Sequence, residues 1–269
     1  MERYDLATNA WEAVAPLAET RSAHAVAVLD GKLYAVGGHD DNGGDDLSSV
    51  ERYDPALDAW EAVAPMASAR TLAAVAVLDD KLYAVGGLGL SSVERYDPAV
   101  DAWETVAPMA VPRGLIDVAV LDGKLYAVGG CNGGGGYLSS VERYDPAVDA
   151  WEAVAPMATS RERLGVACLD GKLYAVGGYN DNDNDGGGSL SSVERYDPAV
   201  NAWEEVAPMA EGRDTHAVAV LDGNLYAVGG EDSDSYSLSS VERYDPATNV
   251  WESVVPMAMA RSRSGVALL

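Results

Sequence analysis

The chain has 269 residues, a formal net charge of −25 at pH 7, and two cysteines, Cys131 and Cys168. So acidic a composition argues against nucleic-acid and anionic-membrane partners, because binding phosphate groups needs clustered Lys and Arg, and we expect basic or neutral partners instead. The two cysteines fall in different repeats and imply no disulfide framework, so we expect a reducing, cytoplasmic location. No apolar run approaches the ~20 residues of a membrane span, and Met1 leads into the charged residues ERYD rather than into a signal peptide.

One motif recurs along the chain and sets its organisation. The sequence LDGKLYAVGG occupies residues 29–38 and returns with small changes at 78–87, 121–130, 169–178 and 221–230. Tryptophan recurs with the same period, at Trp11, Trp60, Trp103, Trp151, Trp203 and Trp251. A repeat of roughly 40–50 residues is typical of a propeller blade, and stacked repeats share one continuous core. We therefore predict a single domain over residues 1–269.

Each repeat predicts four short strands whose composition places them radially. In the first complete repeat they are residues 24–29, 32–38, 48–54 and 59–66. The first strand is almost all Ala and Val, as expected where strands crowd around a central axis with both faces covered. The third alternates Val50 and Arg52 with Glu51 and Tyr53, and the fourth offers Trp60 as one large anchor. Polarity therefore rises from the axis outward, and no segment keeps the apolar spacing of a helix.

The turns support the same arrangement. Asp-Gly joins the first and second strands in four repeats, and such a pair between apolar runs indicates a tight hairpin with positive φ at both positions. The second repeat has Asp79-Asp80 instead, which predicts a slightly strained or longer turn, since Asp tolerates the left-handed region better than most residues. Asp-Pro begins the turn between the third and fourth strands, as in a type I turn.

These residues together resemble the kelch-repeat pattern. A double glycine ends one strand, a Tyr such as Tyr53 lies in the next, and a Trp such as Trp60 follows seven residues later. The chain resembles the kelch propeller of the Kelch-like (BTB-BACK-kelch) family over nearly its whole length, and it lacks the Gly-His and Trp-Asp marks of WD40 repeats. The resemblance implies an all-β kelch propeller with six-bladed geometry. The blades would span about 21–67, 70–110, 113–158, 161–210, 213–258, and 261–269 with 1–18.

The last of these blades departs from the pattern. Six tryptophans are present but only five double-glycine strands, so a blade assembled from both termini would hold a first, a third and a fourth strand and would lack its second. The strand edges beside the missing strand would be unpaired and open to another strand. We expect either that the sequence is part of a longer chain, or that a strand donor or a second chain completes the blade.

Differences among the repeats concentrate in two sets of loops on one face of the disc. These are the loops that follow each double glycine and the loops that enter each first strand; we call their side the variable face. The turns on the opposite side, the uniform face, barely change from repeat to repeat. Loops on a fixed frame commonly make binding surfaces, and drift alone would also have changed the exposed turns of the uniform face. We therefore predict that the variable face binds a protein or peptide.

The family resemblance also implies which residues bind. In Kelch-like propellers the contacts with substrate peptides come from residues just after the repeated Arg and just after the double glycine. With their neighbours, the matching positions are Ser22, His24, His39, Thr71, Leu88, Gly114, Cys131, Asn132, Tyr137, Glu162, Arg163, Tyr179, Asn180, Asp214, Thr215, Glu231, Tyr236, Ser262 and Arg263. Arg163 and Arg263 break the repeat and are candidates for binding a carboxylate or phosphate. The Arg present in every repeat is expected to be structural, tying loop carbonyls or pairing with the Glu of VERYD.

Metal ions and cofactors are not expected. Asp181, Asp183, Asp185 and Gly186 resemble the start of a calcium loop, but the twelfth position is Ser192, where a bidentate Glu belongs. No ligand spacing for zinc or copper joins the histidines, which are His24, His39 and His216.

Three classes of function remain open. The sequence favours a non-catalytic recognition module, and the resemblance implies the substrate-recognition domain of a cullin-type ubiquitin-ligase adaptor. An engineered or idealised propeller with no natural ligand would also have copies this similar. A kelch-type copper radical oxidase would need a Tyr joined to a Cys and paired His ligands, but no suitable His adjoins Cys131, and Cys168 falls in an inner strand.

Overall fold

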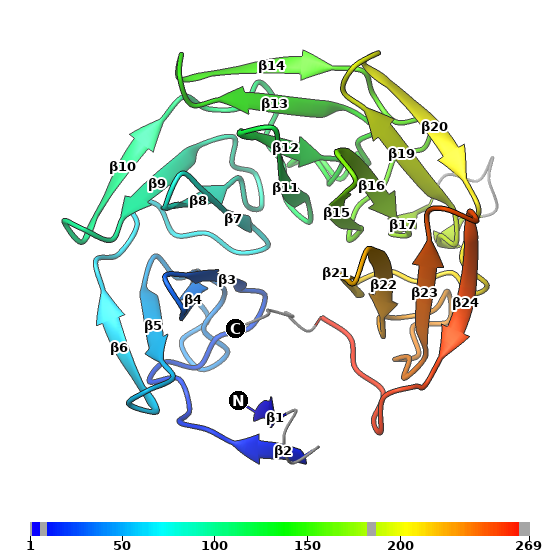
Figure 1. The fold of residues 1–269 in the computed structure, drawn as a ribbon. Helices are drawn as coiled ribbons and strands as arrows, with labels where there is room; N and C mark the ends of the chain where they lie inside the picture. Colours follow the sequence, from blue (N-terminus) through cyan, green and yellow to red (C-terminus); the bar gives the residue numbers. More distant parts are fainter. Residues whose placement is uncertain (1, 6–9, 182–186, 264–269) are drawn as a thin grey trace.

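The structure is a computed structural model that describes residues 2–5, 10–181 and 187–263. Five antiparallel sheets of four strands each stand around a central axis as the blades of a propeller (Figure 1). Within each blade the strands follow one another from the axis to the rim. The predicted all-β propeller is confirmed.

The blades are numbered here in chain order, and their strands have nearly identical lengths. Blades 1 and 2 contain β3 (Ala25–Leu29), β4 (Lys32–Val36), β5 (Val50–Asp54) and β6 (Ala59–Val63), then β7 (Ala74–Leu78), β8 (Lys81–Val85), β9 (Val93–Asp97) and β10 (Ala102–Val106). Blades 3 and 4 contain β11 (Asp117–Leu121), β12 (Lys124–Val128), β13 (Val141–Asp145) and β14 (Ala150–Val154), then β15 (Gly165–Leu169), β16 (Lys172–Val176), β19 (Val193–Asp197) and β20 (Ala202–Val206). Blade 5 contains β21 (Ala217–Leu221), β22 (Asn224–Val228), β23 (Val241–Asp245) and β24 (Val250–Val254). A small hairpin in a loop of blade 4 pairs β17 (Tyr179–Asn180) with β18 (Gly188–Ser189).

A two-stranded sheet lies at a sixth position in the ring, between blade 5 and blade 1 (Figure 1). It pairs β1 (Glu2–Asp5) with β2 (Ala10–Ala13), and its register places Tyr4 opposite Trp11 as Tyr53 lies opposite Trp60 in blade 1. The described residues thus form five complete blades and one outer hairpin. The first strand predicted for a sixth blade falls in residues 264–269, outside the described residues, so a blade closed by both termini stays a prediction.

The turns on the uniform face have the predicted conformation. Asp30 and Gly31 have φ of 51° and 69°. Asp79 and Asp80 have φ of 51° and 55°, and Leu78 still pairs with Lys81 across the turn. The turn keeps its length, so of the two expected outcomes, a slightly strained or a longer turn, the structure shows the strained one. Its strain remains, because Asp80 adopts a left-handed conformation that glycine adopts at lower cost.

The hydrophobic core lies between neighbouring blades. At the first junction, Tyr34, Val36 and Met66 of blade 1 pack with Leu82 and Tyr96 of blade 2, and each of these side chains is at most 3% exposed. Corresponding clusters fill the junctions between blades 2 and 3, 3 and 4, and 4 and 5. Each blade therefore depends on its neighbours for a core, as in other repeat proteins.

The repeated Tyr and Trp also join neighbouring blades by hydrogen bonds. The Asp101 carboxylate, held at a φ of 50°, accepts from Tyr96 Oη at 2.8 Å and from the Ala64 N–H of the preceding blade at 2.9 Å. Trp103 Nε1 donates to the Ala64 carbonyl at 2.9 Å. The same three bonds recur at the other blades, with Asn in place of Asp in blades 4 and 5. The motif thus fixes the angle between blades.

The structural role predicted for the repeated Arg is confirmed in blades 1 to 5. The buried Arg70 donates from Nη1 to the carbonyls of Gly86 at 2.6 Å and Ser92 at 2.8 Å, and from Nη2 to Glu94 Oε1 at 2.9 Å. Glu94 also accepts two backbone N–H groups from the loop that enters the blade. A buried ion pair is tolerated when such further bonds satisfy both partners. The other arginines with this role are Arg21, Arg113, Arg161 and Arg213.

Candidate functional site

Backbone pairing brings the two sets of variable loops together. In blade 5 the Asp214 N–H donates to the Glu231 carbonyl at 3.0 Å, and the Glu231 N–H donates to the Asp214 carbonyl at 2.8 Å. Equivalent pairs are Ser22 with His39, Gly114 with Cys131 and Glu162 with Tyr179. In blade 2 the Leu88 N–H donates to the Thr71 carbonyl at 3.0 Å. The residues predicted to bind therefore lie beside each other, blade by blade.

A series of backbone hydrogen bonds runs from blade to blade beside the central opening, which we call the mouth. It joins the residue two positions after each repeated Arg to its counterpart in the preceding blade. The N–H donors and carbonyl acceptors are Leu72 to Ala23 at 3.1 Å, Leu115 to Leu72 at 3.0 Å, Arg163 to Leu115 at 2.9 Å, Thr215 to Arg163 at 3.0 Å and Arg263 to Thr215 at 2.9 Å. We call this set the mouth ring. These loops enter β3, β7, β11, β15 and β21, which stand nearest the axis (Figure 1).

Every member of the mouth ring has a left-handed backbone, with φ between 48° and 56°. This conformation is uncommon for non-glycine residues and unfavourable for Leu and Thr. Backbone strain held in place by surrounding structure is often found at ligand-binding sites. The sequence prediction included Arg163, Thr215 and Arg263 but missed Ala23, Leu72 and Leu115, although their common distance from the repeated Arg could have identified all of them.

Carboxylates gather in the sector of the mouth formed by blades 4 and 5. Glu162 and Asp214 are buried, whereas Glu231 is partly exposed. Arg163 places Nε 3.3 Å from Glu162 Oε1 and Nη1 3.9 Å from Asp214 Oδ1. Arg263 places Nε 3.5 Å from Glu231 Oε1. Both arginines that were predicted to take a partner's anion already have carboxylates of their own chain beside them, so an acidic partner would have to compete with these.

Aromatic and apolar groups occupy other parts of the variable face. The rings of Tyr137 and Tyr179 lie 6.1 Å apart between centroids, and the Arg163 guanidinium lies 5.6 Å from the Tyr179 centroid in a cation–π contact. Leu88 is 55% exposed and Tyr236 is 70% exposed. These side chains offer a partner apolar area beside the acidic sector.

Other predicted residues are engaged inside the loops. Asn132 Oδ1 accepts the backbone N–H groups of its own turn, and Asn180 is buried with its amide donating to Ser160 Oγ at 3.2 Å. Cys131 is buried, and burial followed by the nearby Glu162 charge raises the pKa of its thiol to about 11. At the edge of the mouth, Ser262 Oγ donates to Glu231 Oε1 at 2.8 Å.

The three histidines have different surroundings in the structure. His39 Nδ1 is 3.0 Å from Asp46 Oδ1 near the surface. His24 is half-buried, and burial followed by the Arg21 charge lowers its pKa. His216 is buried, and burial lowers its pKa to about 3, which keeps the ring neutral. Within residues 2–5, 10–181 and 187–263, no three His, Cys, Asp or Glu side chains are arranged to hold a metal ion. The calcium-like positions 183, 185 and 186 lie outside the described residues.

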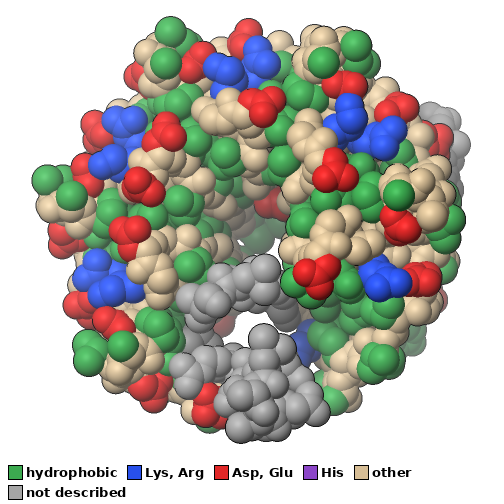
Figure 2. All heavy atoms as spheres, in the orientation of Figure 1, with side chains coloured by type: hydrophobic (Ala, Val, Ile, Leu, Met, Phe, Trp, Pro, Cys, Tyr) green, Lys and Arg blue, Asp and Glu red, His purple; other side chains and the backbone are tan. Residues whose placement is uncertain are grey.

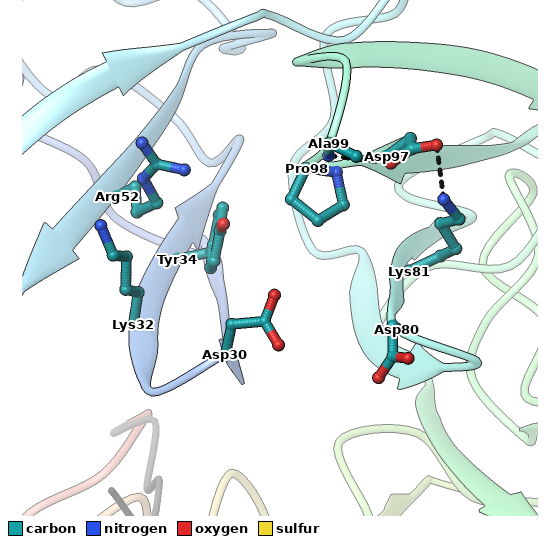
Figure 3. Close-up of a pocket in the computed structure, with 9 residues that line it drawn as sticks. All are labelled: Asp30, Lys32, Tyr34, Arg52, Asp80, Lys81, Asp97, Pro98 and Ala99. Atoms are coloured by element: carbon teal, nitrogen blue, oxygen red, sulfur yellow. Dashed lines mark hydrogen bonds and ion pairs between the residues drawn. The ribbon is translucent and has the colours of Figure 1, made fainter.

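Two cavities open away from the mouth. One, of about 360 Å³, lies between blades 1 and 2 on the uniform face (Figure 3) and is lined by Asp30, Lys32, Tyr34, Arg52, Asp80, Lys81, Asp97, Pro98 and Ala99. Its lysines are paired, Lys32 with Asp54 at 3.0 Å and Lys81 with Asp97 at 2.5 Å. The other, of about 560 Å³, is lined by Ala18, Glu19, Ser49, Val50, Glu51, Ala62, Val63 and Pro65. Of the residues lining the first cavity, only Asp80 departs from the repeat, so we place the candidate site at the mouth.

The face shown in Figure 2 repeats one pattern around the disc. Lys and Arg side chains stand beside Asp and Glu, hydrophobic side chains protrude at the outer rim, and no His is in view. This is the composition of the uniform face, where Lys124 pairs with Asp145 and where Leu57 and Val100 are exposed. Within the described residues, the chain has no helix with the length and apolar character needed to cross a membrane.

Known proteins share this fold and its repeats. A family model described as "Kelch motif" matches residues 20–67 and 69–110, and one described as "KLHDC2/KLHL20/DRC7 Kelch-repeats domain" matches residues 97–268. The chain is 49% identical to Kelch-like protein 1 of Mus musculus over 47 residues, which cover 18% of this chain and 6% of that protein. It is 41% identical to Kelch-like protein 33 of Homo sapiens over 46 residues, 17% of this chain and 9% of that protein. The matched segments are thus a small part of these relatives.

A solved structure, "Structure of YjhT", superimposes on the chain with a TM-score of 0.79. The two are 15% identical, and the superposition covers 91% of this chain and 88% of the other. At this identity the likeness concerns the fold alone.

Proposed function

The chain belongs to the kelch-repeat family, and from that premise we propose that it is a non-catalytic module that recognises a protein or peptide at the mouth of the variable face. The observation that carries the proposal is the mouth ring, which holds six side chains of four kinds, Ala, Leu, Arg and Thr, around one opening. A rigid frame with unlike loops on one side suits recognition, because the frame stays constant while the loops set specificity. The proposal treats the whole chain as one propeller domain.

Two buried groups support the non-catalytic part of this proposal. A pKa of about 11 keeps the Cys131 thiol protonated at neutral pH and therefore weakly nucleophilic. A pKa of about 3 keeps His216 neutral, far from the value that suits a general acid or base near pH 7. The finer form of the proposal, drawn from likeness to Kelch-like proteins, is that the partner is a substrate of a ubiquitin-ligase adaptor. The alternative is an idealised scaffold without a ligand, which the near identity of the repeats favours.

We also propose that the sixth position is a blade whose inner strands are added to β1, from the same chain or from a strand donor. The support is the junction beside blade 5. Leu221 is 49% exposed there, whereas its equivalents Leu29, Leu78, Leu121 and Leu169 are 3% to 5% exposed. A peptide with the sequence KLYAVGG would cover this side chain and pair with an open strand edge, so it should raise the Tm. A scrambled peptide with the same effect would contradict the proposal.

Two exposed leucines on opposite faces test the recognition proposal. Leu88 is 55% exposed on the variable face and Leu57 is 74% exposed on the uniform face. Peptides selected from a random display library on the wild-type protein should bind Leu88→Ser several-fold more weakly and Leu57→Ser unchanged, because only the first substitution removes apolar area from the site. Selected peptides that lose affinity for Leu57→Ser but not for Leu88→Ser would place recognition on the uniform face and contradict the proposal.

A further inference from the structure

Blade 5 places two acidic residues directly opposite each other at the mouth. Asp214 and Glu231 exchange both backbone hydrogen bonds, at 3.0 and 2.8 Å. Residues paired in this way project their side chains from the same face of the two segments, with Cβ atoms about 5 Å apart. Like charges at such a pair are destabilising. The three corresponding bridges join Ser22 with His39, Gly114 with Cys131 and Glu162 with Tyr179, so the like-charged pair is particular to blade 5.

The Asp214 carboxylate is buried, and one of its two oxygens accepts no hydrogen bond. The residue is 3% exposed, and its Oδ2 accepts from Ser189 Oγ at 2.8 Å. Among the described residues Oδ1 accepts no hydrogen bond of regular geometry; the Thr215 hydroxyl lies beside the carboxylate and lowers its pKa, and Arg163 Nη1 is 3.9 Å from Oδ1. A buried acceptor without a donor destabilises the folded state, so it calls for an explanation. Burial raises the pKa of Asp214, and the charge of Glu231 adds to this effect.

Charge balance in this sector remains negative after the arginines are counted. Three carboxylates, those of Glu162, Asp214 and Glu231, face two guanidinium groups, those of Arg163 and Arg263. The Glu231 side chain is 15% exposed, and the Arg263 side chain beside it is 67% exposed and so free to move away. The whole chain adds a long-range field of the same sign, with a net charge of −25. A cation approaching the mouth is therefore attracted at long range, and the excess of negative charge at blade 5 attracts it most strongly.

We propose that the Asp214–Glu231 pair is the anchor for a lysine or arginine side chain of the partner, which makes a cationic segment the preferred ligand of the mouth. This inference rests on the proposed recognition function and names its ligand class. The incoming cation contacts Glu231, relieves the repulsion between the two carboxylates and supplies the donor that Asp214 Oδ1 lacks. Charge-assisted hydrogen bonds of this kind are stronger than those between neutral groups. The neutral part of the mouth, including Leu88 and Tyr137, contacts the residues that flank the cation.

The test uses peptides selected from a random display library on the wild-type protein, then measured individually by fluorescence anisotropy. We expect the selected peptides to share a Lys or Arg, and replacement of that residue by Gln should weaken binding about tenfold. Glu231→Gln and Asp214→Asn should each weaken binding of the unchanged peptide by a similar factor. Both substitutions should leave the Tm the same or higher, because each removes one of two repelling charges.

Asp222→Asn is the matched control, because it removes one negative charge from the same blade at the opposite face. Asp222 is exposed in the β21–β22 turn at a φ of 49°, and Asn-Gly suits that turn. It should change affinity less than twofold. An equal loss in Asp222→Asn and Glu231→Gln would reduce the effect to general charge attraction and overturn the inference.

Other outcomes separate the inference from the function on which it rests. Selected peptides that lose affinity for Leu88→Ser, but need no cationic residue and bind Glu231→Gln unchanged, would overturn the anchor and leave recognition at the mouth standing. Peptides insensitive to every substitution at the mouth would overturn both. One-to-one binding of Ca²⁺ alone that Glu231→Gln abolishes would assign the pair to a metal ion and also overturn the inference.

Discussion

Asp117 should weaken the fold at neutral pH, and replacing it should make the protein more stable. The residue begins β11, an inner strand, where the corresponding residues of three other blades are Ala25, Ala74 and Ala217. Its carboxylate accepts the Val166 N–H of the next blade at 2.7 Å and the N–H of the following residue at 2.8 Å. Burial among the inner strands nevertheless raises its pKa from 3.8 to about 6. The low-dielectric surroundings therefore outweigh both hydrogen bonds.

The magnitude follows from the pKa difference. A shift from 3.8 to about 6 corresponds to about 3 kcal/mol of destabilisation once the carboxyl is ionised, and partial access of water to the central channel makes this an upper limit. Because the folded-state pKa is raised, the folded state holds its proton more tightly than the unfolded state. The penalty is therefore absent below pH 3.8 and complete above pH 6. Losing the bond from Val166 offsets about 1 kcal/mol.

Asp117→Ala should thus be about 1–2 kcal/mol more stable than the wild type at pH 7.5, and equal or slightly less stable at pH 4. Urea unfolding of both proteins at the two pH values measures the difference, and an unchanged m-value would show that the unfolded state is comparable. A wild type that is more stable than the variant at both pH values would refute the reasoning.

Substitutions at four further positions test the packing of the blades. His216 has a pKa of about 3 in the folded state against 6.5 in the unfolded state, so the wild type loses folding stability as the pH falls below 6.5. His216→Leu lacks this loss, so its free energy of unfolding relative to the wild type should increase by about 2 kcal/mol between pH 7.5 and pH 5, as measured by urea unfolding. Asp101→Ala removes two hydrogen bonds between blades and should lower the Tm by about 3–5 °C, whereas Asp101→Asn should leave it nearly unchanged. Gly86 and Gly123 both have positive φ, but a Cβ would lie 2.3 Å from the Arg113 carbonyl only at Gly86; Gly86→Ala should therefore lower the Tm far more than Gly123→Ala, and equal losses would contradict the packing described.

Much of the fold could be predicted because the sequence of each blade contains local patterns that specify its strands and turns. The Asp-Gly turns, the apolar inner strands and the double glycines each specify a neighbouring structure, and the invariance of the repeated Arg pointed to its bonds with Glu94 and its equivalents. The bonds that join different blades were not predictable in the same way. Asp101 reaches Ala64 of the preceding blade only because the propeller sets their distance, and no local pattern encodes that contact.

For the candidate site, too, local features could be predicted from the sequence, whereas contacts between blades could not. The sequence separated the variable face from the uniform face, because repetition makes differences visible. It left out Leu72 and Leu115 of the mouth ring, whose position is set by backbone bonds between blades rather than by residue type. It also treated Arg163 as available to an anion, since the neighbouring Asp214 comes from another blade and its distance of 3.9 Å depends on how blades 4 and 5 pack together.

A crystal structure of the protein with a peptide selected from a random library tests the central claim most directly. Our account predicts that the peptide lies across the mouth ring, contacts Leu88 or Tyr179, and places a lysine or arginine beside Glu231. A peptide bound on the uniform face, among turns such as those of Leu57 and Asp80, would contradict it.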